Sequence, residues 1–481
     1  MKRTKIVCTI GPASESTAKI TQMVRAGLNV ARLNFSHNKH SHHGMLIRNI
    51  RAVSKKLNTP VAILQDLQGP KIRIGELPSE GVKITRGETV ALVQQSYRAP
   101  KESAMTHIPI QYDNLYHDVK KGDRILIEDG KIELKVLSVK GKAIHCKVKV
   151  TETIKSHKGM NFPDTSITTS PITAKDKKDI AFGISKDVDF VSLSFVKTAA
   201  DVKGLRRLID SLEAKKPAAR RGTKIIAKIE RPEAVKNFEK ILDEVDGIMI
   251  ARGDLGLEIP LEDLIPVQKH IIRRCMQESK PVIVATQMLD SMINYPVPTR
   301  AEISDVANAI LDGTDAIMLS GESATGKYPV KAVEVMNKIA SHIEAESMYR
   351  LERIGEELKT IGPVTESVAY AAQDIAEDVR AAAIICPTIS GLTARSVVKY
   401  RSITPVIGIA TTEKGRNQLA LSWGVTPELL ASADTFDALV KNVKQHVLKK
   451  KLVRKGATVV IAAGDQLGAA GMSNVVKVDH I

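Results

Sequence analysis

The feature that most constrains the fold is an eightfold alternation of short β-branched runs with longer amphipathic segments. The eight runs are Lys5–Gly11, Asn29–Ser36, Pro60–Leu67, Asp189–Val196, Lys224–Glu230, Gly247–Asp254, Pro281–Met288 and Ala316–Glu322. Strands that alternate with helices pair in parallel, so the pattern predicts an α/β protein with a parallel sheet. Eight units favour closure into a (β/α)8 TIM barrel, although the spacing alone leaves an open doubly wound sheet as an alternative.

One gap in the alternation predicts an insertion. Between the third and fourth runs lie about a hundred residues that read as short alternating strands joined by Gly turns. Asp129-Gly130, in RILIEDGKIELKV, is a strong hairpin signal. We therefore expect an all-β domain that leaves the barrel after its third strand, where it can act as a lid over the site at that end.

A third unit follows the barrel. A long helical stretch ends near Tyr349, and three further strand candidates come after it, at Ala381–Cys386, Pro405–Ala410 and Ala457–Ala463. Amphipathic helices separate them, which predicts a C-terminal α/β domain. The predicted divisions are 1–70 and 169–348 for the barrel, 71–168 for the inserted domain and 349–481 for the C-terminal domain.

Charge and composition limit the classes of ligand that the chain is expected to bind. The net charge of +17 favours an anionic partner or anionic substrates. Aromatic residues make up only 3% of the chain, which argues against a base-stacking nucleic-acid surface and favours phosphorylated metabolites. The four cysteines are far apart with no CxxC pair, and no run reaches the ~18 apolar residues of a membrane span. We expect a cytoplasmic protein with neither a membrane nor a nucleic-acid partner.

The active site of a TIM barrel lies at the carboxyl ends of its strands, so the polar residues that close each run are candidates. They are Arg32, Asn34, Ser36, Asp66, Lys228, Glu230, Arg252, Asp254, Thr286, Ser320 and Glu322. Cations, carboxylates and hydroxyl groups are thus expected to converge. Any one of them could instead have a structural role, in an ion pair that neutralises a buried charge at the end of a strand.

Two of these carboxylates predict a metal site. Glu230 and Asp254 come from neighbouring strands, and Mg²⁺ typically takes one or two carboxylates and leaves its other positions to water and substrate. Lys228 shares a strand face with Glu230, so its ammonium can stabilise a phosphoryl group beside the metal. Arg32 and Arg73 offer planar groups suited to phosphate or carboxylate. By contrast, Thr299-Arg300-Ala301-Glu302 matches a helix capping box and needs no catalytic explanation.

Several segments together resemble the pyruvate kinase family. They are TKIVCTIGPAS, NVARLNFSH, DLQGPKIR, KIIAKIE, GIMIARGDLGLEIP, VIVATQMLDSMI and PTRAEISDVANAILDGTDAIMLSGESATGKYP. Their order and spacing also agree with the family, and the likeness runs through all three units. It implies transfer of the phosphoryl group of phosphoenolpyruvate to ADP, the last step of glycolysis, by a homotetramer.

The resemblance also implies residue roles. Lys228 stabilises the phosphoryl group in transfer, Glu230 and Asp254 bind Mg²⁺ or Mn²⁺, and a second Mg²⁺ arrives with ADP. Phosphoenolpyruvate contacts are implied for Arg32, Lys228, Gly253, Asp254 and Thr286, nucleotide contacts for Arg32, Asn34, His37 and Arg73, and enolate protonation for Thr286, Ser320 and Glu322. Since neither Thr nor Ser titrates near neutrality, we expect a bound water to carry the proton.

Many family members need K⁺, which the resemblance places at Asn34, Ser36, Asp66 and the backbone of Leu67. This chain departs nearby, because Lys71 stands where the K⁺-dependent members have Glu. A fixed ammonium can supply the charge that the ion would bring, so we expect activity without K⁺. The alternative is a solvated lysine at the start of the lid.

The turn at Thr388, Ser390 and Thr393 matches the family's allosteric site and suits a phosphorylated effector, although it reads equally well as an ordinary strand-to-helix turn. The segment Gly464–Gly471 lacks Lys and Arg, which argues against fructose 1,6-bisphosphate. Two other functions stay open at this stage. They are a metal-dependent carbon–carbon lyase and a basic nucleic-acid-binding or scaffold protein.

Overall fold

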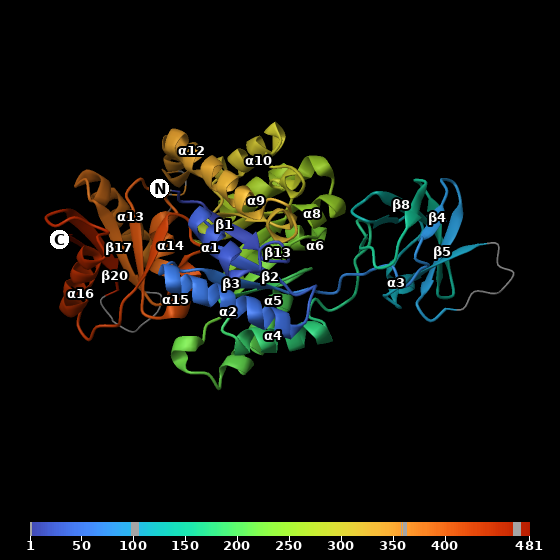
Figure 1. The fold of residues 1–481 in the computed structure, drawn as a ribbon, viewed down its shortest axis with the longest axis horizontal. Coiled ribbons are helices and arrows are strands. Elements are labelled where there is room, and N and C mark those ends of the chain that lie inside the picture. Colours follow the sequence, from blue (N-terminus) through green and yellow to red (C-terminus); the bar gives the residue numbers. More distant parts are fainter. Residues whose placement is uncertain (1, 98–104, 357, 359–362, 465–472) are drawn as a thin grey trace.

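The computed structural model describes residues 2–97, 105–356, 358, 363–464 and 473–481. Three bodies follow one another along its long axis, with the barrel in the middle (Figure 1). Within the described residues, every helix is too short or too polar to cross a membrane.

Eight parallel strands close into the central barrel in the order β1-β16-β15-β14-β13-β12-β3-β2. The strands are β1 (Lys5–Thr9), β2 (Val30–Asn34), β3 (Ala62–Asp66), β12 (Phe190–Leu193), β13 (Lys224–Ile229), β14 (Gly247–Ala251), β15 (Val282–Ala285) and β16 (Ala316–Leu319). Each lies within one of the eight runs, so the barrel prediction is confirmed and the open sheet is excluded. Nearly every strand residue is buried, as expected for a parallel sheet covered by helices.

Helices surround the barrel. They are α1 (Thr17–Ala26), α2 (His40–Leu57), α4 (Ala174–Ser185), α5 (Ala199–Glu213), α6 (Pro232–Lys236), α7 (Phe238–Glu244), α8 (Arg252–Glu258), α9 (Leu264–Gln277), α10 (Arg300–Leu311), α11 (Gly321–Ala324) and α12 (Pro329–Glu356), with short 3-10 turns η1 (Ala218–Arg220), η2 (Leu261–Asp263) and η3 (Asp290–Ile293). Thr299 and Glu302 form the predicted capping box of α10. Helix α12 runs past Tyr349, where we expected it to end, to Glu356.

The inserted region carries two small sheets. Strands β4 (Val82–Ile84) and β10 (Glu152–Ile154) pair with each other, and the second sheet has the order β11-β7-β8-β9-β5-β6. Its strands are β5 (Thr89–Gln94), β6 (Thr106–Ile110), β7 (Arg124–Ile127), β8 (Ile132–Lys140), β9 (Ala143–Val148) and β11 (Met160–Asn161), accompanied by α3 (Leu115–Asp118). The predicted hairpin is present between β7 and β8, and Asp129 and Gly130 both have positive φ, as a tight turn requires.

The C-terminal body is a five-stranded sheet in the order β19-β18-β17-β20-β21. It contains α13 (Val364–Asp378), β17 (Ala383–Thr388), α14 (Leu392–Val398), β18 (Val406–Ala410), α15 (Glu413–Leu419), β19 (Val425–Leu429), α16 (Phe436–Lys449), β20 (Thr458–Ala463) and β21 (Val475–His480). The three predicted strands are present, and β19 and β21 were not predicted. This body packs against the end of the barrel opposite the inserted domain (Figure 1).

Candidate active site

The carboxyl ends of the barrel strands face the inserted domain, because the chain enters that domain directly after β3. Asp66, the last residue of β3, is buried at the centre of the strand ends. Its Oδ2 lies 2.7 Å from Arg32 Nε, its Oδ1 accepts a hydrogen bond from Ser192 Oγ at 2.6 Å, and the same Oδ1 lies 3.5 Å from Lys228 Nζ. Burial raises the pKa of Asp66, but the charges of Lys228 and Arg32 outweigh it and hold the pKa below its usual value. Asp66 is therefore ionised and positions two cations.

Lys228 stands on β13 with its ammonium among oxygen atoms. Its Nζ lies 2.8 Å from Glu230 Oε1 and donates to Ser194 Oγ at 2.9 Å. Burial alone would lower the pKa of Lys228, but Asp66 and Glu230 outweigh it and raise the pKa. The ammonium therefore stays charged throughout the physiological range.

Glu230 and Asp254 provide carboxylate oxygens from adjacent strands. Glu230 is buried, its Oε2 accepts the Phe195 N–H at 2.7 Å, and its Oε1 is paired with the Lys228 ammonium at 2.8 Å. Burial raises the pKa of Glu230, with Lys228 opposing and Asp254 adding to the rise. A divalent cation fits these two carboxylates, because it would relieve both the burial and their mutual repulsion.

The strands on the far side of the ring end in strained backbone. Thr286 and Gln287, which follow β15, have φ of 72° and 56°, a region that bulky residues rarely occupy. Thr286 Oγ1 accepts the N–H of Gly253, at the start of α8, at 2.7 Å. Strain of this kind is concentrated at functional sites, where the surrounding structure holds it in place.

Glu322 joins the last two strand ends. Its carboxylate accepts the N–H of Ser320 at 2.7 Å and that of Leu289 at 3.1 Å. Burial raises its pKa. Glu322 therefore holds the loops after β15 and β16 together and orients Ser320.

Comparison with known proteins identifies the family. The model of the pyruvate kinase barrel domain matches residues 1–333, and the model of the pyruvate kinase alpha/beta domain matches residues 366–479. The chain belongs to the pyruvate kinase family. A pyruvate kinase of Clostridium acetobutylicum is 42% identical over 484 residues, which cover 100% of both chains. Pyruvate kinase 2 of Synechocystis is 44% identical and covers 100% of this chain and 79% of the relative.

A solved structure agrees with these matches. The crystal structure of a pyruvate kinase from Cryptosporidium parvum has a TM-score of 0.91 and 36% sequence identity, and covers 100% of this chain and 96% of that one. The pyruvate kinase fold therefore extends over the whole chain, and the chain is an enzyme of this family. Members of the family generally use a divalent metal, in agreement with the fit at Glu230 and Asp254.

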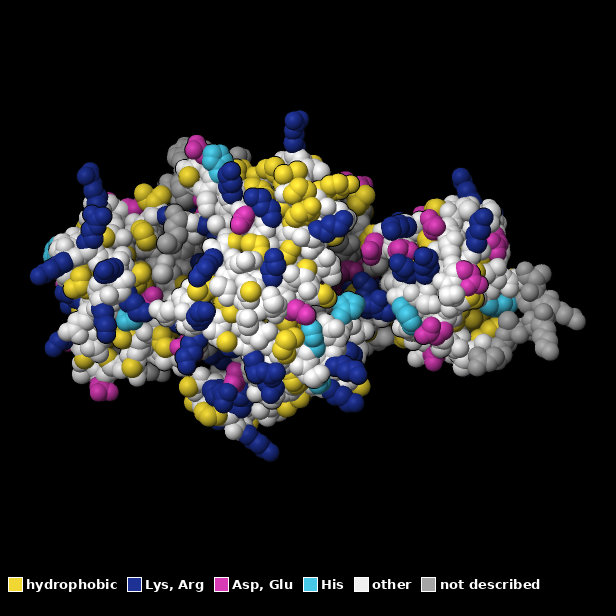
Figure 2. Space-filling model, viewed as in Figure 1, with side chains coloured by type: hydrophobic (Ala, Val, Ile, Leu, Met, Phe, Trp, Pro, Cys, Tyr) yellow, Lys and Arg dark blue, Asp and Glu magenta, His cyan; other side chains and the backbone are white. Residues whose placement is uncertain are grey.

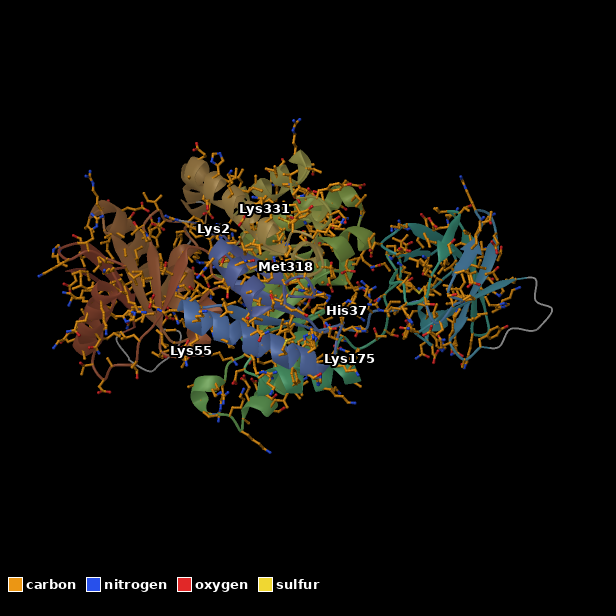
Figure 3. All side chains as sticks on the ribbon, in the orientation of Figure 1. Lys2, His37, Lys55, Lys175, Met318 and Lys331 are labelled. Atoms are coloured by element: carbon orange, nitrogen blue, oxygen red, sulfur yellow. The ribbon has the colours of Figure 1, made fainter. Side chains whose placement is uncertain are left out.

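Three cations, Arg73, Arg32 and Lys175, lie close enough to His37 to act on its charge, and they form a cationic rim. His37 follows β2, and burial, helped by Arg73, Arg32 and Lys175, lowers its pKa. His37 and Lys175 lie on the side of the barrel that faces the inserted domain (Figure 3). Arg73 Nη1 donates a hydrogen bond to the carbonyl oxygen of His157 at 3.0 Å. The positive charge of this rim can bind an anionic group of a substrate.

The positions expected for a monovalent cation lie next to one another, because Asn34 and Asp66 are direct partners in the register of β2 and β3 and Leu67 follows Asp66. Asn34 Oδ1 accepts the N–H of Ser36 at 3.1 Å, and the carbonyl of Leu67 accepts Ser194 Oγ at 2.8 Å. The Nζ of Lys71 lies 3.2 Å from Asp254 Oδ1. Its ammonium is thus paired with one of the two carboxylates that a divalent cation would fit.

Arg252 is one expected site residue that points away. Its guanidinium pairs with both carboxylate oxygens of Asp305, at 2.7 Å each, and is buried. Its Nη2 also donates to the carbonyl of Thr286 at 2.9 Å, so Arg252 connects the start of α8 to α10 and to the residues after β15.

The predicted effector residues lie in the C-terminal body, at the end of the barrel opposite the carboxyl ends of its strands. Thr388 Oγ1 accepts the Gly391 N–H at 2.9 Å, Thr393 Oγ1 lies 2.6 Å from Ser473 Oγ, and Ser390 lies in the turn between Thr388 and α14. Apart from Gly464, the segment Gly464–Gly471 lies outside the described residues.

Sequence reasoning missed several supporting residues. Ser192 and Ser194 support Asp66 and Lys228, Thr9 Oγ1 accepts from Arg32 at 2.8 Å, and Lys175 adds to the rim. The two serines alternate at the end of the fourth run, so the strand period that selected Arg32 and Asn34 would have found them.

Proposed function

We propose that this chain catalyses the transfer of the phosphoryl group of phosphoenolpyruvate to ADP, which yields pyruvate and ATP. The family matches support the reaction, and one geometric observation supports the location of the site. The permanently charged Lys228 ammonium lies 2.8 Å from Glu230 and 3.5 Å from Asp66 at the centre of the strand ends. A buried and fixed positive charge can stabilise the negative charge on the oxygens of a phosphoryl group in transfer.

Substrate binding follows from the same arrangement. Arg32, held by Asp66 and Thr9, would bind the phosphate, and Gly253, Asp254 and Thr286 would bind the rest of phosphoenolpyruvate. Mg²⁺, or Mn²⁺ in its place, would be held by Glu230 and Asp254 and would supply positive charge to the oxygens of the phosphate and the enolate.

The second half of the reaction adds a proton to the enolate carbon. Thr286 and Ser320 would orient a water that delivers it, because neither hydroxyl titrates near neutrality. Glu322 would act through Ser320, whose backbone it holds at 2.7 Å.

We further propose that Asn34, His37 and Arg73 border the phosphates of ADP. The lowered pKa of His37 supports a neutral imidazole at pH 7, so the positive charge at this rim would come from Arg32, Arg73 and Lys175. A neutral ring can still donate one hydrogen bond to a phosphate oxygen.

The test of the function is a K⁺-free assay of pyruvate formation with phosphoenolpyruvate, ADP and Mg²⁺. Lys228→Met should lower kcat by at least ~10²–10³, because a preorganised charge is lost. Lys338→Met, on the exposed face of α12, is the matched control and should keep full activity. A folded wild-type protein that forms no pyruvate, with or without K⁺, would refute the proposal.

Lys71 supports activity without K⁺. Its Nζ lies 3.2 Å from Asp254, so a fixed cation already stands beside the substrate position. We expect Lys71→Glu to be nearly inactive in K⁺-free buffer and to recover when K⁺ is added, whereas the wild type should be indifferent to K⁺. Turnover of the wild type only after K⁺ addition would contradict this assignment.

We also propose a homotetramer. Large apolar side chains are exposed on one side of the barrel near α10, where they gather in Figure 2. The exposed large apolar side chains of η2, α9, α10 and the segment that precedes α10 are Leu261, Ile265, Tyr295, Val297 and Ile303. An exposed group of this kind is typical of a subunit interface. Light scattering of the purified chain would measure the stoichiometry.

Two further assignments belong to the same proposal. A cytoplasmic location is supported by the four cysteines, which are all free and buried. The turn at Thr388, Ser390 and Thr393 remains the proposed position of a phosphorylated effector.

A further inference from the structure

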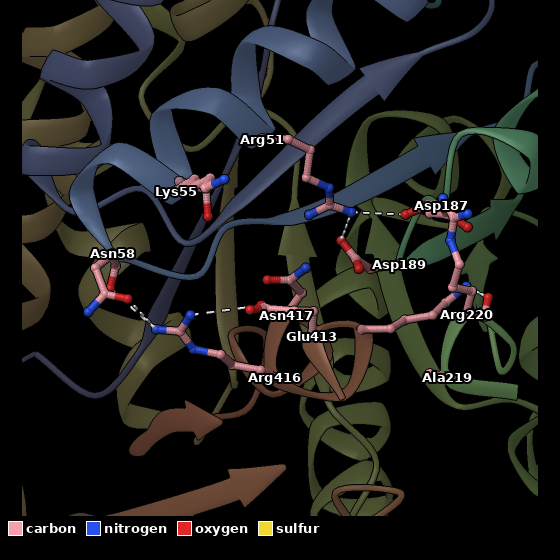
Figure 4. Close-up of a pocket in the computed structure, with 12 residues that line it drawn as sticks. Arg51, Lys55, Asn58, Asp187, Asp189, Ala219, Arg220, Glu413, Arg416 and Asn417 are labelled. Atoms are coloured by element: carbon pink, nitrogen blue, oxygen red, sulfur yellow. Dashed lines mark hydrogen bonds and ion pairs between the residues drawn. The ribbon is translucent and has the colours of Figure 1, made fainter. Parts of the chain in front are cut away.

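A cavity of about 480 Å³ lies between the barrel and the C-terminal body (Figure 4). Its walls come from α2, from the residues that precede β12, from η1 and from α15. These segments lie at the amino-terminal ends of the barrel strands, so the cavity is at the opposite end of the barrel from the candidate active site. Its volume is within the range of small-molecule sites.

The charged residues of the cavity are not fully paired with one another. Five of its lining residues are Lys or Arg and three are Asp or Glu. Arg51 is bound to Asp189 at 2.8 Å and Arg220 to Asp187, so these two cations are neutralised locally. The remaining positive charge therefore lies on the other wall, around α15 and the end of α2.

Arg416 and Lys55 carry this remaining charge. Arg416 is 9% exposed, and its Nη2 donates to the carbonyl of Asn58 at 3.3 Å. Its Nε has no hydrogen-bond partner among the described residues, and its nearest carboxylate, Glu413, is 3.9 Å away. Lys55 is exposed at the cavity mouth, and no described carboxylate lies within ion-pair distance of it. A buried donor without an acceptor is costly, so an anionic ligand group would stabilise this wall.

The opposite wall has a buried acceptor behind its surface. Asp189 is fully buried, and its Oδ2 binds both Arg51 and the N–H of Ile63, the latter at 2.6 Å. Its Oδ1 has no hydrogen-bond partner among the described residues. A bare anion would be repelled by this carboxylate, whereas a hydroxyl group would donate to it.

We propose that this cavity binds a small phosphorylated sugar or polyol. Its phosphate would accept hydrogen bonds from Arg416 and Lys55, and a hydroxyl group would donate to Asp189 Oδ1. The site is distinct from the turn at Thr388–Thr393. Because α2 belongs to the barrel and α15 to the C-terminal body, an occupied cavity joins the two.

The experiment measures the thermal unfolding midpoint, Tm, of the full chain with added probes. Glycerol 3-phosphate and glucose 6-phosphate test the proposed class, and glycerol, glucose and inorganic phosphate are added separately. We expect at least one phosphorylated probe, at about ten times its Kd, to raise Tm by roughly 2 °C. The unphosphorylated probes should have no effect, and inorganic phosphate should bind at least tenfold more weakly.

Variants locate the binding site. Lys55→Glu should weaken binding at least tenfold, and the fold should tolerate the change because Lys55 is exposed. The matched control is Lys56→Glu, the same change at the next residue, which is exposed and does not line the cavity. This variant should bind the probes as the wild type does. Lys228→Met and Thr393→Val should also bind normally, which separates this cavity from the active site and from the predicted effector turn.

Three results would overturn the proposal. They are the absence of any shift with both phosphorylated probes, a shift that Lys55→Glu leaves unchanged, and inorganic phosphate binding as tightly as the esters. Any of them would leave the proposed kinase reaction untouched, because that is measured separately by pyruvate formation.

Discussion

The inserted domain and the C-terminal body are attached to opposite ends of the barrel by different kinds of contact. The C-terminal body is joined through buried charged groups. Lys414 Nζ donates to Thr223 Oγ1 at 2.6 Å and lies 3.2 Å from Glu213, and Lys224 donates to the carbonyl of Ser390 at 2.9 Å. Arg401, 1% exposed, pairs with Asp315 and stacks 4.4 Å from the ring centre of Trp423.

The described contacts of the inserted domain with the barrel are fewer and partly exposed. Glu258, the last residue of α8, accepts hydrogen bonds from Asn161 Nδ2 at 3.0 Å and from the Phe162 N–H at 3.3 Å. Ser166 Oγ donates to Glu233 at 2.7 Å, in an exposed place.

This difference indicates which unit can move. Breaking a buried ion pair leaves an uncompensated charge, whereas an exposed contact contributes little. We infer that the C-terminal body is fixed to the barrel and that the inserted domain can open and close over the active site. The following three predictions test this contrast.

The largest effect is expected at the fixed attachment. Arg401→Met should lower the free energy of unfolding by about 3–5 kcal/mol, because Asp315 would stay buried without its partner. Urea unfolding measures the loss. Lys441→Met, exposed on α16, is the matched control and should change stability by less than ~0.5 kcal/mol. An equally small effect of Arg401→Met would mean that the interface is not held by this pair.

The second-largest effect is expected on how the free energy of unfolding depends on pH. Burial, helped by the charge of Arg395, lowers the pKa of Lys224 to about 7. Above pH 7 the folded protein therefore releases a proton that the unfolded chain keeps up to about pH 10. Because the unfolded state then binds more protons, Lys224 makes stability rise with pH, by at most ~1.4 kcal/mol per unit.

Lys224→Met should remove this rise. The stability of the wild type relative to the variant should grow between pH 7 and pH 9, as measured by urea unfolding at both values. Lys441→Met should show no such trend. A constant difference across this range would show that Lys224 does not lose its proton there.

The smallest effect is expected at the movable attachment. Glu258→Ala should lower kcat about tenfold while stability falls by only ~1–2 kcal/mol, because two donors lose their acceptor. Glu258→Gln keeps an acceptor oxygen and should restore most of the activity. If both variants kept wild-type kcat, Glu258 would have no part in positioning the inserted domain.

Much of the fold could be predicted because the barrel strands are buried on both faces and read as apolar β-branched runs. The two missed strands lack this signal. β19 contains Pro427 and a half-exposed pattern, and β21 is an edge strand whose residues are mostly half-buried. Their positions depend on pairing with β18 and β20, which local sequence does not encode.

The positions of site residues that lie at the carboxyl ends of strands could be predicted from the sequence. The partner that a long side chain pairs with could not. Arg32, Asp66, Lys228 and Glu230 converge as the barrel geometry required. Arg252 has the same strand-end position, yet it turns to Asp305 on α10, more than fifty residues away in sequence. The ion pair of Lys71 with Asp254 likewise arises only when the inserted domain is folded against the barrel.

Helix α8 has Asp254 in its first turn and Glu258 as its last residue. The two residues are four positions, or about 6 Å, apart on a short rigid helix, so a shift of its last turn by roughly 1 Å would be passed to Asp254. A displacement of that size at a reacting centre can cost ~10²-fold in rate. Helix α8 is therefore a rigid connection between the inserted domain and Asp254, the carboxylate proposed to hold Mg²⁺. If the inserted domain moved away, the same residues would all be present, but Asp254 would no longer stand where the proposed metal needs it.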